Sequence, residues 1–141
     1  FTERVALLKG LDASIMEDIA KRLPITEGVP RLMKVLKTCG YKIAILSGGF
    51  TYFGEYLQRQ FGFDYVYANE LEVGEDGKLT GRYVGDIVDL PMLTEAGLGI
   101  AFHAKPRVAA NAGQNINNMG LDGVLYFLGF KDSYLGNQGR L

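Results

Sequence analysis

Ser47, Gly48 and Gly49 stand between a short apolar run at 42–46 and a segment with helical spacing that starts near Phe50. A helix that directly follows a strand leaves its first backbone N–H groups unpaired, and the helix dipole adds positive partial charge there. Glycine lets the backbone approach an anion closely because it has no Cβ atom. The residues could therefore form a phosphate clamp, in which the Ser47 hydroxyl and the Gly48 amide are the donors.

A purely structural interpretation competes with this clamp. Ser47 could cap the helix that follows, while the two glycines form a tight turn. On the residue types alone this interpretation is slightly favoured, because capping serines are common. A decision between the two requires a further observation.

The composition limits the kinds of partner that this chain can have. Its 141 residues include 15 basic and 16 acidic side chains, for a net charge of −1, which argues against a nucleic-acid partner. No run is long enough to span a membrane, and no leader peptide is evident. Cys39 is the one cysteine, so an internal disulfide is excluded and the cytoplasm is the expected location. The oligomeric state stays open, with a homodimer as one alternative.

Hydrophobic spacing divides the first half of the chain into helices and strands. A capping box at 14–17 predicts a helix that Pro24 ends, and Thr26 is expected to cap a second helix that closes at Gly40. A buried strand is predicted at 42–46 and a helix from Phe50 to Phe61. A strand at 65–73, a turn at 74–77 and alternation from 79 to 83 predict a two-stranded flap.

The second half continues the alternation of helix and strand. We expect a short helix from Leu90, a buried strand at 98–104, a poor helix at 106–119 and a last strand at 123–130. Alternating helices and strands predict an α/β fold with a Rossmann-like parallel sheet.

Five segments carry a resemblance to a known family. They read RVALLKGL at 4–11, YKIAILSGGFT at 41–51, YANELEV at 67–73, LTGRYVGDIVD at 79–89 and LPMLTEAGLGIAFHAKP at 90–106. In this order they resemble the phosphoserine phosphatases of the haloacid dehalogenase-like superfamily, over nearly the whole chain. The set of segments is specific, although no one of them would be enough.

The resemblance implies a reaction and three substrate-binding residues. In this family an aspartate attacks the phosphorus of O-phosphoserine, a second aspartate acts as acid and base, and Mg²⁺ spans the phosphate. The matched motif assigns phosphoryl binding to Ser47 and Gly48. The match to RVALLKG assigns the substrate carboxylate to Arg4, whose planar guanidinium suits it. Residues 1–26 are expected to belong to a helical cap and residues 27–141 to the core, with the flap at about 70–89.

This sequence departs from the family in two places. The strand with the aspartate nucleophile motif should precede Phe1, and a stretch with the lysine and the metal motif should lie between Asp89 and Leu90. We therefore expect that Asp89 and Leu90 are not consecutive in the intact protein. If they were bonded, their Cα atoms would lie about 3.8 Å apart; we expect a larger separation. The aspartates Asp86 and Asp89 in GDIVD have the wrong spacing for the metal motif, so we interpret them as the base of the flap.

The missing carboxylates leave two alternatives to a phosphoserine phosphatase. The chain could be a catalytically inactive, truncated module that keeps the phosphate clamp. It could also come from a phosphatase for another small phosphomonoester.

Overall fold

The computed structural model describes residues 1–85, 100–102, 106–110, 112–118 and 120–131. The chain forms two compact units. The first, called here the sheet unit, is Phe1–Pro24 with Ala44–Val88, and the second, called the α3 unit, is Ile25–Ile43 with Asp89–Leu141. No helix within the described ranges is long and apolar enough to cross a membrane. The helix predicted from Leu90 and the junction between Asp89 and Leu90 fall outside these ranges.

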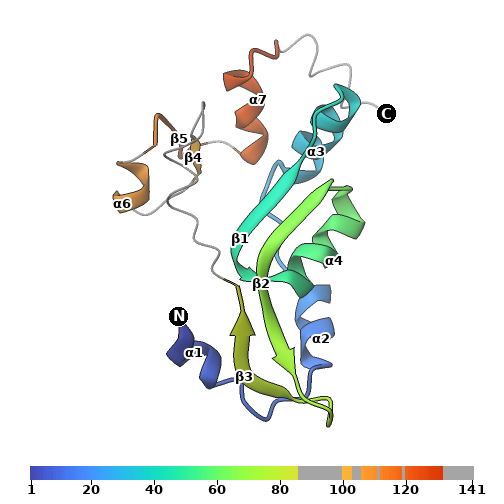
Figure 1. Cartoon of the computed structure of the whole chain (residues 1–141). Coiled ribbons are helices and arrows are strands. Elements are labelled where there is room, and N and C mark those ends of the chain that lie inside the picture. The colour runs from blue at the N-terminus through green and yellow to red at the C-terminus, as the bar shows by residue number, and fades with distance from the viewer. Residues whose placement is uncertain (86–99, 103–105, 111, 119, 132–141) are drawn as a thin grey trace. The chain divides into compact units, whose positions relative to one another are not determined.

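The sheet unit is built on three strands in the order β1-β2-β3. Strand β1 (Ala44–Phe50) pairs in parallel with β2 (Tyr65–Val73), and β2 pairs antiparallel with β3 (Leu79–Val84). Helix α4 (Thr51–Phe61) makes the crossover that a parallel pair requires, and Figure 1 shows it running beside β2. This β1–α4–β2 arrangement confirms the predicted α/β class.

The β2–β3 hairpin is the flap that the sequence predicts. Strand β2 has the predicted bounds, and the turn after it places Gly77 at φ +75°, a conformation that glycine adopts without strain. The Gly77 amide donates to the Gly74 carbonyl at 3.0 Å and closes this turn. Strand β2 therefore belongs both to the flap and to the parallel pair with β1.

Two short helices precede the sheet in this unit, α1 (Thr2–Ala6) and α2 (Ile15–Lys21). The predicted capping box at the start of α2 is wrong. Ser14 has helical backbone angles and makes no capping bond with its side chain. Instead, the Asp12 carboxylate accepts a hydrogen bond from the Ser14 amide at 2.9 Å, in a local turn directly before the helix.

The α3 unit has its core between helices. Helix α3 (Val29–Thr38) packs Leu32 and Val35 against Leu125, which is fully buried. Arg31 on α3 also pairs with Asp122 at 3.0 Å. The remaining elements are strands β4 (Ile100–Phe102) and β5 (Gln114–Ile116), helix α6 (Pro106–Ala109), the 3-10 turn η1 (Leu121–Gly123) and helix α7 (Val124–Phe127).

Two predictions for the C-terminal half are wrong. The helix expected over 106–119 ends at Ala109, and β5 follows it and pairs in parallel with β4. The asparagines and the glycine of this segment are weak helix formers, so pairing of β5 with β4 outweighs the local preference for a helix. The strand expected over 123–130 does not form: Gly123 ends η1, Val124–Phe127 form α7, and residues 128–130 lie after that helix. A short apolar run does not distinguish strand from helix, and contact with α3 decides the outcome here.

Replacing Leu125 tests the packing of α7 on α3. We expect Leu125→Ala to lower the free energy of unfolding by about 3 kcal/mol, because it leaves a cavity between the two helices. The measurement is urea unfolding followed by circular dichroism. Leu128→Ala is the matched control, since Leu128 is 37% exposed and should lose much less. Equal losses at both positions would contradict the helical packing.

Candidate functional site

Ser47, Gly48 and Gly49 lie within strand β1 rather than after it. The strand was expected to end at Leu46 but continues to Phe50. Its pairing with β2 is irregular, because Leu46 lies opposite Tyr67 and Phe50 opposite Asn69. Three residues of β1 therefore face one residue of β2. The Ser-Gly-Gly segment is a bulge at the carboxyl end of a parallel strand, where ligands of open α/β sheets bind.

The structure contradicts the capping interpretation of Ser47. The N-cap of α4 is Phe50, and no side chain caps this helix. The half-buried Ser47 bonds within the bulge instead, where its Oγ accepts a hydrogen bond from the Gly49 amide at 3.0 Å. A hydroxyl that accepts such a bond still has its own hydrogen to donate. Ser47 thus keeps the chemistry that a phosphoryl oxygen requires.

Asn69 contacts the same bulge from β2, and the sequence analysis did not select it. Its Nδ2 donates to the Gly48 carbonyl oxygen at 3.0 Å, and only 2% of the residue is exposed. Asparagine is disfavoured in strands, so its place in the strand segment YVYANELEV was the signal that could have identified it.

Arg4 lies on α1, which packs against β3 and begins directly after Phe1. Arg4 is exposed, and its amide donates to the Phe1 carbonyl at 3.0 Å, so the two residues are one turn apart. The Phe1 ring lies 5.9 Å from the Phe50 ring and 5.0 Å from the Tyr83 ring, measured between centroids. This aromatic cluster places the beginning of α1 next to the last residue of β1. Arg4 and Ser47 thus belong to one compact unit, with Phe1 and Phe50 as the link between them.

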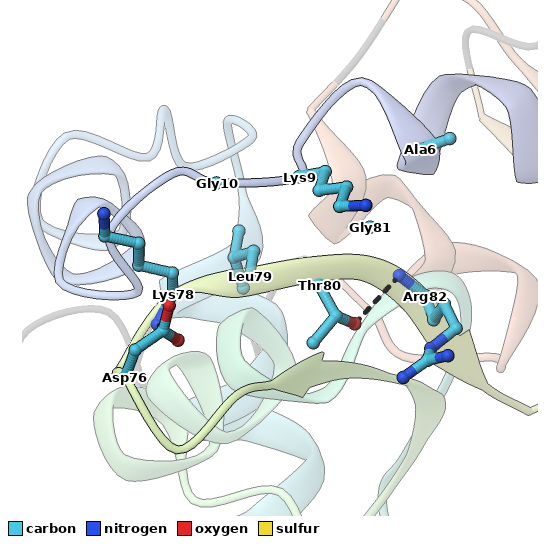
Figure 2. Close-up of a pocket in the computed structure, with 9 residues that line it drawn as sticks. All are labelled: Ala6, Lys9, Gly10, Asp76, Lys78, Leu79, Thr80, Gly81 and Arg82. Atoms are coloured by element: carbon cyan, nitrogen blue, oxygen red, sulfur yellow. Dashed lines mark hydrogen bonds between the residues drawn. The ribbon is translucent and has the colours of Figure 1, made fainter.

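The other end of α1 is fixed on the flap. Gly81 of β3 has φ +81°, and a Cβ atom there would lie 3.1 Å from the Ala6 carbonyl oxygen and 3.0 Å from Lys9 Cβ. Figure 2 shows Lys9 and Gly81 close together on these two segments. Close backbone approach therefore requires a glycine at this position of the flap.

A cavity of about 570 Å³ lies between residues 6–10 and residues 76–82 of the flap (Figure 2). Arg4, Ser47 and Gly48 do not line it. Two of its charged side chains already have partners: Arg82 Nε donates to Glu72 at 2.7 Å, and the Asp76 carboxylate accepts from the Lys78 amide at 3.1 Å. The Thr80 hydroxyl and the Arg82 guanidinium lower the pKa of Glu72 below its ordinary value. This cavity is a feature of the flap and is separate from the bulge.

The described residues do not form a metal site. Within the ranges that the structure describes, no group of three His, Cys, Asp or Glu side chains is placed to hold a metal ion. Asp86 and Asp89 lie outside those ranges. The residues that the structure describes therefore do not by themselves fit Mg²⁺.

Comparison with known proteins identifies the family. The sequence pattern of the haloacid dehalogenase-like hydrolases matches residues 2–106. The chain belongs to this family. A phosphoserine phosphatase of Streptomyces coelicolor is 40% identical over 157 aligned positions, which cover 89% of this chain and 38% of that protein.

Solved structures agree with this membership. A probable phosphoserine phosphatase of Vibrio cholerae, in an unliganded form, matches 99% of this haloacid dehalogenase-like chain and 52% of its own, with a TM-score of 0.80 and 34% identity. A phospho-aspartyl intermediate analogue of phosphoserine phosphatase matches 89% of this chain and 75% of its own, with a TM-score of 0.81 and 32% identity.

The chain spans only part of the length of these relatives, 38% and 52% for the first two. The alignment with the Streptomyces protein also runs over more positions, 157, than this chain has residues, 141. The relative therefore contains positions that no residue of this chain matches.

Proposed function

We propose that the intact protein hydrolyses O-phospho-L-serine to L-serine and phosphate, as the last step of serine biosynthesis in the cytoplasm. The observation that carries this proposal is the Ser47 hydroxyl, held in a glycine bulge at the carboxyl end of a parallel strand. The similarity to phosphoserine phosphatases supports it. The position of α1 supports it as well, because α1 bears Arg4 and follows Phe1, whose ring contacts the Phe50 ring.

This chain's own residues bind and orient the substrate in the proposed reaction. The Ser47 hydroxyl and the Gly48 amide donate to two phosphoryl oxygens, and the Arg4 guanidinium pairs with the substrate carboxylate. Residues 1–26 belong to the cap in this proposal, and closure of the cap on the core excludes water.

The covalent steps belong to segments that this sequence lacks. An aspartate oxygen attacks phosphorus, the bond to the serine oxygen breaks, and serine leaves with a proton from the second aspartate. Water then hydrolyses the aspartyl-phosphate. A relative that is named for an intermediate analogue of this kind supports the scheme. We assign Mg²⁺ to the same missing segments.

Replacing Ser47 tests the phosphate clamp directly. We expect Ser47→Ala to weaken the binding of inorganic phosphate by about tenfold, because a hydrogen bond to a charged group is lost. Isothermal titration calorimetry gives the affinity. Ser14→Ala is the matched control, since Ser14 is exposed at the start of α2. Unchanged phosphate affinity in Ser47→Ala would remove the basis of the proposal.

Replacing Arg4 separates phosphoserine from other phosphomonoesters. In the intact enzyme, Arg4→Ala should reduce kcat/KM for phosphoserine by at least about tenfold and leave phosphoethanolamine, which has no carboxylate, nearly unchanged. Lys9→Ala is the control, because Lys9 is also an exposed cation next to α1. Equal losses for both substrates would show that Arg4 does not bind the carboxylate and would favour the alternative of a different phosphomonoester.

The second candidate is a truncated phosphate-binding module. The intact mass of the natural protein distinguishes the two. We expect a mass several kilodaltons above the 15.5 kDa of this sequence, because an active phosphatase needs both missing segments. A mass of 15.5 kDa would favour the module.

A further inference from the structure

Asn69 is a buried polar residue next to the phosphate clamp, although it contributes none of the proposed donors to the phosphate. It lies opposite Phe50, where the pairing of β1 with β2 resumes after the bulge. Burial of a side-chain amide is unfavourable unless the amide is hydrogen-bonded, and the Nδ2 of Asn69 meets that need at the Gly48 carbonyl. This pairing connects a strand residue to the backbone of the clamp.

The hydrogen bond from Asn69 acts on one peptide group. The Gly48 carbonyl and the Gly49 amide are the two ends of the same planar unit, so they rotate together. Asn69 donates to the carbonyl at 3.0 Å, and the amide donates to Ser47 Oγ at 3.0 Å. The three groups form one chain of hydrogen bonds from β2 to the Ser47 hydroxyl, in which each bond polarises the next.

The glycines make this outside support necessary. A Gly-Gly segment has access to many backbone conformations, so the orientation of its peptide plane is poorly determined by local preference. Three residues of β1 face one of β2 here, and a regular ladder therefore does not hold them. The bond from Asn69 supplies a fixed partner at the centre of the bulge.

Gly85 confines the Asn69 side chain from the end of the flap. It follows β3 directly and has φ +131°. A Cβ atom at Gly85 would clash with Asn69 Oδ1 and would lie 3.1 Å from Asn69 Cα. The backbone at Gly85 thus closes over the asparagine and restricts the positions open to its amide.

We propose that Asn69 is a positioning residue of the phosphate clamp: it orients the Gly48–Gly49 peptide group and, through it, the Ser47 hydroxyl that binds the phosphoryl group. The proposal rests on the proposed function, because it assumes that Ser47 binds phosphate. In this proposal the end of the flap also holds Asn69 in place through Gly85.

The test is Asn69→Leu, which removes the donor at similar size and adds no charge near a bound anion. We expect the affinity for inorganic phosphate to fall by about tenfold. In the absence of phosphate, we also expect the Gly49 amide proton resonance to shift upfield, because its bond to Ser47 Oγ weakens. A merely structural role would lower the melting temperature and leave the Gly49 resonance and the phosphate affinity of the folded protein unchanged, which would overturn the proposal.

Gly85→Ala provides a second route if Asn69→Leu does not fold. Its Cβ atom should displace the Asn69 amide and produce the same two changes. Gly77→Ala is the matched control on the same hairpin, since Gly77 also has positive φ, +75°, but a Cβ atom there would meet nothing within 4 Å. We expect Gly77→Ala to lose stability and keep its phosphate affinity. Equal phosphate affinities in Gly85→Ala and Gly77→Ala would contradict the proposal.

Ser47→Ala separates this proposal from the proposed function. If Ser47→Ala binds phosphate as well as the wild type does, the clamp itself is wrong. The Gly49 resonance in Asn69→Leu then still decides whether Asn69 orients the bulge.

Discussion

The peptide group between Gly48 and Gly49 is held at both ends, by Asn69 at its carbonyl and by Ser47 at its amide. In the proposed function, the orientation of this peptide group sets where the Ser47 hydroxyl and the backbone of the bulge meet the phosphoryl group. The glycines allow close approach of an anion, but the same lack of Cβ atoms leaves their conformation open. A site of this kind therefore needs a rigid neighbour, and β2 provides it through a buried side chain.

The flap and α1 support the same region from a second direction. The Phe1 ring contacts Phe50 of β1 and Tyr83 of β3, and Thr2 shares a hydrogen bond with the Tyr83 hydroxyl at 3.2 Å. The flap thus contacts α1 along its length and closes on Asn69 at its end. A helix of only five residues has little stability of its own, so these contacts with the flap hold α1 where it lies.

In the proposed function, this chain's residues bind the substrate, and the covalent steps belong to residues outside this sequence. The bulge, Asn69 and α1 are all within one compact unit of the 141 residues. The proposal assigns the carboxylates that break the bond to segments outside this sequence. Phosphate binding by Ser47 and Gly48 is the part of that proposal which residues of this chain carry.

The sequence alone determined the features that depend on local residue types. The bounds of β2, the end of α4 at Gly62 and the flap with its turn follow from alternation and from glycines at positive φ, which are properties of short segments. The order of the sequence motifs along the chain indicated the family. Tertiary structure decided that Val124–Phe127 is helical rather than extended, because this helix packs Leu125 against Leu32 and Val35 of α3. It also decided that Ser47 lies in a bulge, since the register of β1 depends on β2, a strand that is distant in sequence. Asn69 became part of the site only through that pairing.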